Sequence, residues 1–366
     1  MIKKAKETMT AKERVLKTFN LEKTDRVTIG YEANAAIHKK VVKTLGIPAC
    51  ENDYELVLQA LGVDYRGVGA PYRGPLLYKT LPGRRVDEVN GFYTRWVGHE
   101  TGGYWDFCDF PLAGAEDETI AEFPVPNPDD FDYEAVSVQI ARHRDYAVYI
   151  GNAGIPDVIN ATGRIMGMED TLVSLLTENE AALGLIRRRA DMQLRVIERT
   201  LEQNRGKIDF MWLGEDLGTQ RSPMIGPELF RKTIRPVHQR FIDLAKAYGL
   251  PVLVHTCGSS SWAYEDFIEM GVRGVDTLQP EAMDMSPGYL KEHFGGRLCF
   301  RGCISTAGPL AYGSTWDVIR NVKETLAVMM DGYGYHFAPT HAIQDNTPPE
   351  NVVAMYQAAH DYGVYL

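Results

Sequence analysis

The chain has 366 residues, 45% of them hydrophobic and 24% charged, which is enough apolar material for a large core. Its 39 Lys and Arg against 49 Asp and Glu give a net charge of −10 without any basic block, which argues against nucleic acid or anionic membrane as a partner. The first ten residues are polar and no apolar run approaches the roughly 20 residues of a membrane-spanning helix, so no signal peptide is expected. The five cysteines are sparse and odd in number, which favours a reducing cytoplasm over a disulfide framework.

The first 132 residues are predicted to mix helices with short strands. Thr10 and Glu13 have the spacing of a capping box, which begins a helix that ends near Asn20. The elements expected next are a strand at 25–31, helices at 36–44 and 53–61, and a short strand near 63–65. Between 67 and 132, frequent Gly and Pro and alternating aromatic residues predict a β-hairpin insertion, a candidate wall over a binding site.

From residue 133 onward, apolar strand patterns alternate with helical ones. Strands are expected at 147–151, 208–214, 250–254, 274–278, 297–302 and 335–338. Helices are expected at 171–204, 227–248, 262–270, 288–294, 315–330 and 349–362. Roughly eight strand–helix units predict one (β/α)8 TIM barrel over 1–366, with an N-terminal extension and the insertion at 67–132. A doubly wound open sheet is the alternative, although no Gly-x-Gly-x-x-Gly follows the first strand and no P-loop is present.

The strand at 250–254 leads into His255 and Cys257, and Gly258 begins a turn. Because side chains alternate along a strand, the imidazole and the thiol point to the same side. Two such groups at the end of a strand suit a zinc ion. Taken alone, a His-x-Cys pair is more often a buried histidine beside a structural cysteine.

Residues just past the carboxyl ends of barrel strands line the active site. His341 occupies such a position, so His255, Cys257 and His341 are the candidate ligands of a catalytic zinc. Glu281 is a candidate fourth, exchangeable ligand or a nearby base. Cys303, at the end of another strand, is an alternative ligand, whereas Cys299 is expected to face the helices.

The remaining strand-end residues are candidates for catalysis and substrate binding. Glu215 and Asp216 could hold a zinc-bound histidine or take a proton, or they could only cap a solvated turn. Gln279 lies after the strand at 274–278 and is a candidate for substrate binding. Five aromatic residues are expected either to form an apolar substrate pocket or simply to pack in the core: Tyr31, Trp96, Tyr104, Trp105 and Trp212.

Several short stretches of the chain are similar to those of a known family. They are residues 12–15, 25–27, 214–218, 225–231, 254–258, 274–276, 338–341 and 347–352. They resemble the uroporphyrinogen decarboxylase superfamily, and within it the corrinoid-dependent zinc methyltransferases. The resemblance covers most of the chain and is weak between about 67 and 132.

The resemblance implies a (β/α)8 barrel that binds zinc through His-x-Cys and a later cysteine in an Ala-Pro-Gly-Cys-Gly segment. The first two ligands fall on His255 and Cys257, but the third position holds His341. Imidazole remains a good zinc ligand, and losing a thiolate makes the zinc a better Lewis acid and a poorer activator of a thiol. The decarboxylase branch carries an Arg-Gln-Ala-Gly-Arg segment that holds substrate carboxylates, and residues 30–34 read Gly-Tyr-Glu-Ala-Asn instead. Porphyrinogen decarboxylation is therefore not expected.

The implied function is a zinc-dependent methyl transfer between a small molecule and the corrinoid (cobalamin) of a partner protein. A methoxyaromatic or a methylamine is the candidate methyl donor, with Tyr31, Trp212 and Gln279 as substrate-binding residues. A decarboxylase or other lyase acting on a small carboxylic acid is the alternative enzyme, and a corrinoid- or metal-binding accessory protein is the non-catalytic alternative. A homodimer is the candidate assembly.

Overall fold

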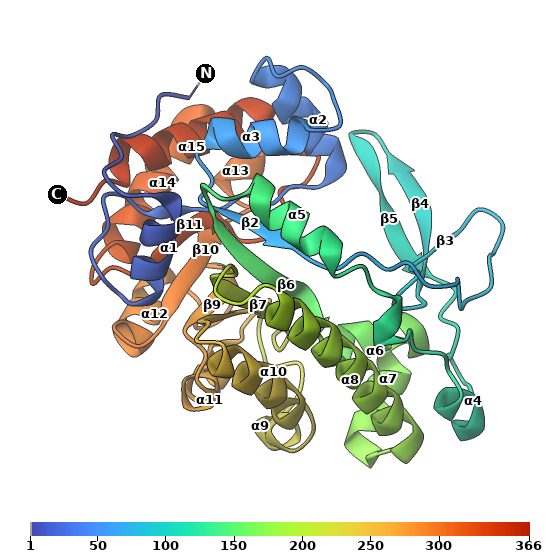
Figure 1. Cartoon of the computed structure of the whole chain (residues 1–366). Helices are drawn as coiled ribbons and strands as arrows, with labels where there is room; N and C mark the ends of the chain where they lie inside the picture. The colour runs from blue at the N-terminus through green and yellow to red at the C-terminus, as the bar shows by residue number, and fades with distance from the viewer. Residues whose placement is uncertain (1) are drawn as a thin grey trace.

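The computed structural model describes residues 2–366, and eight parallel strands in it form one curled sheet. Their order is β1-β11-β10-β9-β8-β7-β6-β2, so successive strands of the chain are neighbours, as in a TIM barrel (Figure 1). The strands are β1 (Thr28–Ile29), β2 (Tyr65–Val68), β6 (Ala147–Pro156), β7 (Phe210–Gly214), β8 (Val252–His255), β9 (Gly274–Leu278), β10 (Cys299–Ile304) and β11 (Tyr335–Pro339). The order never reverses, which excludes the doubly wound alternative.

The two edge strands, β1 and β2, approach each other around Asp64. The amide of Asp64 donates to the carbonyl of Ile29 (3.0 Å), and the Asp64 carboxylate accepts from the amide of Ile29 (2.7 Å). Arg14 and Arg26 each bind this carboxylate at 2.7 Å, and all three charged side chains are buried. Two of the stretches that resemble the family, 12–15 and 25–27, therefore hold the edges of the curled sheet together.

Helices lie outside the sheet, as Figure 1 shows. They are α1 (Ala11–Phe19), α2 (Ala35–Thr44), α3 (Asp53–Leu61), α4 (Asp117–Ala121), α5 (Glu134–Arg142), α6 (Val158–Met166), α7 (Met168–Thr177), α8 (Glu180–Gln203), α9 (Pro227–Leu229), α10 (Arg235–Ala247), α11 (Tyr264–Met270), α12 (Pro287–Phe294), α13 (Pro309–Tyr312), α14 (Thr315–Met329) and α15 (Pro349–Tyr362). The predicted capping box is confirmed, because Thr10 Oγ1 accepts from Glu13 N (3.1 Å) and Thr10 N donates to Glu13 Oε2 (2.8 Å). No helix in the described part of the chain is both long and apolar enough to cross a bilayer.

The helix predicted at 227–248 is interrupted. One wide turn of π-helix, Phe230–Ile234, separates α9 from α10. Pro236 lies in the first turn of α10 and has no amide hydrogen to donate to the preceding turn, which accounts for the interruption.

The sheet separates two apolar cores. A small inner core fills the barrel, with Phe210, Trp212 and Leu253 from the strands and Phe19 from α1, which lies across one end. The larger core lies between the sheet and the surrounding helices. The prediction that Cys299 faces the helices around the barrel is wrong: it lies in the inner core and its thiol donates to the carbonyl of Thr18 (3.0 Å).

A separate antiparallel sheet stands apart from the barrel (Figure 1). Its strands are β3 (Arg85–Val86), β4 (Tyr93–His99) and β5 (Gly102–Cys108). The turn between β4 and β5 reaches α2 and the loop that follows β11, where Thr101 Oγ1 donates to Asp345 Oδ2 (3.1 Å). Lys40 of α2 donates to the carbonyls of Thr101 (3.3 Å) and Asp345 (2.6 Å), so the hairpin tip is anchored.

Candidate metal centre

The end of β8 places His255 and Cys257 on one side of the strand. His255 Nε2 and Cys257 Sγ lie 3.4 Å apart, with the imidazole buried and the thiol half-buried. Gly258 follows with φ of +69°, and a Cβ there would lie 2.3 Å from the carbonyl oxygen of Gly218. Only glycine fits this turn, which follows directly after Cys257.

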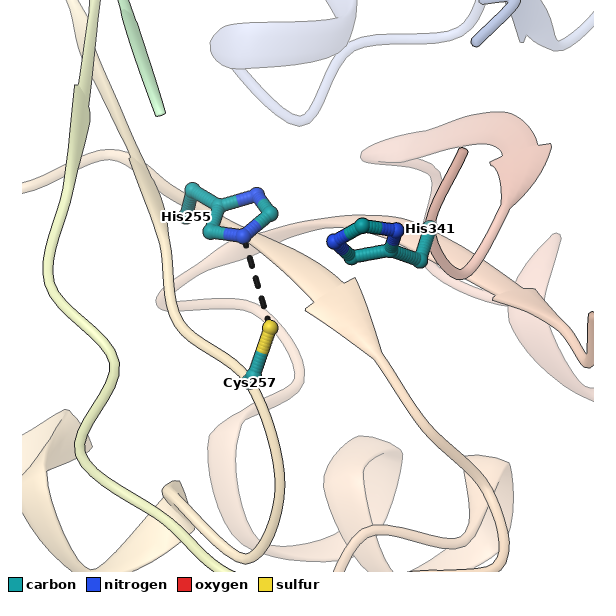
Figure 2. A group of neighbouring side chains, drawn as sticks. All are labelled: His255, Cys257 and His341. Carbon is teal, nitrogen blue, oxygen red and sulfur yellow. Dashed lines mark hydrogen bonds between the residues drawn. The ribbon is translucent and has the colours of Figure 1, made fainter. Parts of the chain in front are cut away.

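His341 reaches the same point from the loop after β11. Its ring centroid lies 5.9 Å from that of His255 with the ring planes inclined at 66°, and Figure 2 shows the two imidazoles next to each other, near Cys257. One atom of each of His255, Cys257 and His341 lies within 4.8 Å of the other two. Two residues that are two positions apart in sequence and one from 84 positions further on (341 minus 257) therefore converge.

The donor set fits a zinc ion. At Zn–N and Zn–S bond lengths of about 2.0–2.3 Å, tetrahedral ligand atoms lie roughly 3.3–3.7 Å apart. The 3.4 Å between His255 Nε2 and Cys257 Sγ is in that range, and the His341 imidazole, which is exposed, needs only a small rotation or shift. Burial raises the pKa of Cys257 to about 11, so a metal would displace a proton from this thiol.

His255 is oriented by two neighbours on β9. Its Nδ1 lies 3.1 Å from Asp276 Oδ2 and 2.6 Å from Thr277 Oγ1. A hydrogen bond from Nδ1 to the carboxylate fixes the tautomer that leaves Nε2 free to bind a metal. Asp276 rather than Glu215 or Asp216 occupies the position that orients this imidazole.

The carboxylate of Asp276 is itself held by Arg301 of β10. Both side chains are fully buried and in direct contact, and Arg301 also donates to Tyr65 Oη (2.7 Å) and Glu32 Oε2 (3.1 Å). Burial alone would raise the pKa of Asp276, but Arg301 and His255 outweigh it and hold the pKa at about 2. Neither Asp276 nor Arg301 was a candidate from sequence. Each is a charged residue within an otherwise apolar strand, and that pattern could have identified it.

Asp216 lies beside the cluster and Glu215 does not. Asp216 Oδ1 lies 3.7 Å from His255 Nε2 and accepts from the amide of Cys257 (3.0 Å), and Asn160 Nδ2 donates to Oδ2 (2.8 Å). Burial would raise the pKa of Asp216, but the contacts with His255 and Cys257 lower it. Asp216 is therefore an ionised carboxylate within reach of a proton at the site.

Glu215 points away from the cluster. Its buried carboxylate accepts from the amides of Val158 (2.7 Å) and Ile159 (2.9 Å), the first residues of α6, and lies 2.9 Å from His238 Nε2. It caps a buried helix end, where a negative charge is favourable. Asp157, just before α6, was not a candidate from sequence: burial and then the charge of Glu215 raise its pKa well above the usual range of an aspartate.

The other strand-end candidates lie outside the cluster in the described part of the chain. Glu281 is exposed and is not among the three grouped ligands. Gln279 Oε1 accepts from the amide of Gly258 (2.6 Å) and so supports the turn after Cys257. Cys303 is buried in the outer core, because Gly302 and Cys303 both have positive φ and turn its side chain out of the barrel.

The five aromatic candidates divide into two groups. Trp96, Tyr104 and Trp105 are exposed on the hairpin of β4 and β5. Tyr31 and Trp212 line a cavity of about 320 Å³ beside the inner core. Glu32 also lines the cavity, and Arg301 contacts both Glu32 and Asp276, the residue that lies beside His255.

Comparison with known proteins agrees with this architecture. Residues 113–362 match the uroporphyrinogen decarboxylase (URO-D) family, which is more than half of the chain. The chain belongs to that family. The matching part contains β6 to β11, the strands that carry His255, Cys257, Asp276 and His341. The resemblance inferred from the short stretches is thus confirmed at the family level.

A solved structure shares the fold over nearly the whole chain. It is a methyltransferase from Methanosarcina mazei, with a TM-score of 0.68 and 17% sequence identity over 97% of this chain and 99% of the other. At this identity the likeness concerns the fold. None of the curated proteins compared with the chain matches it in sequence.

Proposed function

We propose that this protein is a zinc-dependent methyltransferase that moves a methyl group from a small molecule to the corrinoid of a partner protein. The observation that carries the proposal is the convergence of His255, Cys257 and His341 at the carboxyl ends of the strands. Three protein ligands with one open position are typical of catalytic rather than structural zinc. The shared fold of a methyltransferase supports the same reaction class.

The residues around the three ligands have separate roles. Asp276 orients His255, and Arg301 keeps the carboxylate of Asp276 ionised and fixed. Asp216 can accept a proton at the cluster, and its contact with the Cys257 amide fixes its position. Zinc, when bound, would supply Lewis acidity to an oxygen or nitrogen of the substrate. Glu281 would need movement of its loop to become a fourth ligand.

The substrate side of the proposal rests on the cavity that Tyr31 and Trp212 line. A volume of about 320 Å³ suits a small molecule, and aromatic walls suit a methoxyaromatic or a methylamine. A cytoplasmic, reducing setting would keep Cys257 available as a ligand. The carboxyl face of the barrel is where a corrinoid protein would present its cobalt.

A decarboxylase of the porphyrinogen type is less well supported by the same cavity. Only one of the described residues that line this cavity is an arginine or a lysine. It is Arg66, which is paired with Glu55 (2.7 Å). A substrate with many carboxylates needs several unpaired cations.

The test is methyl transfer to free reduced cobalamin by the purified, zinc-loaded chain. Methoxyaromatics and methylamines are offered as donors, and formation of methylcobalamin is followed by its absorption spectrum. Cys257→Ser should abolish the reaction, whereas Cys50→Ser, at an exposed and free cysteine, should not. Release of carbon dioxide from a carboxylic acid without any methyl transfer would replace this proposal by the lyase.

A further inference from the structure

The cavity that Tyr31 and Trp212 line has an aromatic part and a polar part, the polar part including Glu51, Asn52, Glu55, Arg66 and His143. Tyr31, Tyr54, Tyr65, Tyr149 and Trp212 line it together with the carboxylate of Glu32. Their rings contact one another around it, with centroids 6.1 Å apart for Tyr31 and Tyr54 and 5.2 Å apart for Tyr149 and Trp212. Four tyrosines and a tryptophan in a space of about 320 Å³ leave room for a small ligand between ring faces and edges.

The charges at this cavity favour a cation. Glu32 uses one oxygen, Oε2, for both of its contacts with Arg301 (3.1 Å each), and Oε1 has no partner in the described part of the chain. Arg301 is fully occupied by Asp276, Glu32 and Tyr65 Oη. Glu51 also lines the cavity and is exposed. Among the described residues, no unpaired arginine or lysine lines the cavity to hold an anion, whereas a carboxylate oxygen is free to attract a positive charge.

We infer that this cavity binds a methylated ammonium group, and that the methyl donor of the proposed reaction is a quaternary or tertiary ammonium compound. The inference rests on the proposed function and specifies its substrate class. Aromatic faces attract such cations through the ring quadrupole, and the methyl groups make apolar contacts with the same rings. A methoxyaromatic would instead desolvate Glu32 Oε1 without giving it a partner, which is unfavourable.

Contact with Glu32 also connects the ligand to the metal centre. Arg301 bridges Glu32 and Asp276, and Asp276 lies 3.1 Å from His255 Nδ1. Three side chains, Glu32, Arg301 and Asp276, thus link the ammonium group to His255.

The transfer balances without a proton when the nitrogen is quaternary. The carbon–nitrogen bond breaks with its electron pair left on nitrogen, and the methyl carbon bonds to cobalt. The reduced corrinoid of the proposed function supplies both electrons of the new bond, so cobalt(I) becomes methylcobalt(III). The product is a tertiary amine, formed with the electron pair of the broken bond on its nitrogen.

The test is calorimetric titration of the full zinc-loaded chain with choline and with 3,3-dimethylbutan-1-ol, which has the same shape without the charge. Choline should bind and the neutral alcohol should bind at least roughly tenfold more weakly. Glu32→Gln should weaken choline by roughly tenfold or more while the zinc content stays unchanged. Equal binding of the two probes, or unchanged choline binding in Glu32→Gln, would overturn the inference.

A second variant tests the inference independently, in case Glu32→Gln misfolds. Tyr54→Ala removes one wall of the cavity at a residue that is 49% exposed, so the fold should survive while choline binding falls several-fold. Tyr362→Ala, at a 45% exposed tyrosine on α15, is the matched control and should bind choline normally. Methyl transfer from a methoxyaromatic without any choline binding would refute this inference alone. Choline binding without methyl transfer from any donor would refute the proposed function but not the binding of an ammonium group in this cavity.

Discussion

His255 Nδ1 and Asp276 Oδ2 lie 3.1 Å apart, His255 at the end of β8 and Asp276 in the middle of the adjacent strand β9. The other oxygen of Asp276 contacts Arg301, so the carboxylate cannot rotate without breaking a fully buried ion pair. This arrangement keeps the Nε2 lone pair of His255 directed toward Cys257 and His341. The barrel thereby prepares one ligand before any metal arrives, which reduces the ordering that metal binding requires.

We expect the isolated protein to hold about one zinc ion per chain, because three strand-end ligands match a catalytic site. Cys257→Ser should lose the metal and keep its fold, since the site lies at the barrel mouth. Elemental analysis and circular dichroism measure the two outcomes. Cys50→Ser is the matched control and should retain zinc. Full zinc occupancy in Cys257→Ser would show that the ligand assignment is wrong.

Asp276→Asn should weaken zinc binding by about 10- to 100-fold, because the amide no longer attracts the His255 proton or offsets Arg301. Competition with a chromophoric chelator measures this affinity. Asp266→Asn is the matched control: Asp266 is also a buried carboxylate, but it pairs with Arg231 and Arg235, remote from the ligands. Both variants should be less stable, and only Asp276→Asn should lose zinc affinity. An equal loss in both would mean that Asp276 acts through stability alone.

His336 should make the protein sensitive to acid. Burial, reinforced by Arg301, lowers its pKa to about 3, and neither ring nitrogen has a hydrogen-bond partner in the described part of the chain. The unfolded chain takes up this proton below about 6.5 and the folded chain only below about 3. In that window the unfolded state binds more protons, so the free energy of unfolding falls by up to about 1.4 kcal/mol per pH unit as pH decreases.

His336→Phe should remove this contribution and raise stability at pH 5, because the ring packs against Phe19 (centroids 4.8 Å apart) and needs no polar partner there. Urea unfolding at several pH values gives the slope. His293→Phe, at an exposed histidine, should leave the slope as it is in the parent protein. A parent slope that persists in His336→Phe would assign the acid sensitivity to other groups.

The direction of methyl transfer should be from the small molecule to the corrinoid. One thiolate and two imidazoles leave a zinc site with about one more positive charge than two thiolates and one imidazole would, which favours polarising a donor over activating a thiol. His341→Cys should therefore slow methyl-corrinoid formation and speed the methylation of an added thiol by methyl-corrinoid. Rapid thiol methylation by the unaltered protein, with no methyl-corrinoid from any donor, would show that the direction is reversed.

The sequence by itself determined the parallel strand–helix alternation and the His-x-Cys pair. Both follow from local rules, because strand periodicity places His255 and Cys257 on one side whatever surrounds them. His341 could also be grouped with them from sequence, since carboxyl ends of parallel strands meet at one face. By the same rule Glu215 and Asp216 were both expected at this face, yet only Asp216 lies beside the cluster. Which of two adjacent side chains turns toward a site depends on the loop conformation.

Only the tertiary structure decided which charges meet inside the barrel. Asp276 and Arg301 lie on neighbouring strands whose register shifts between Phe300 and Gly302, and sequence periodicity does not reveal such a shift. The same irregularity turns Cys303 into the outer core while Cys299 stays inside the barrel. The cavity at Glu32 likewise depends on side chains from the segment after β1 and from β2, β6, β7 and α3, which no local pattern relates. A buried charge must find its partner through strand register and packing, and those are properties of the whole sheet.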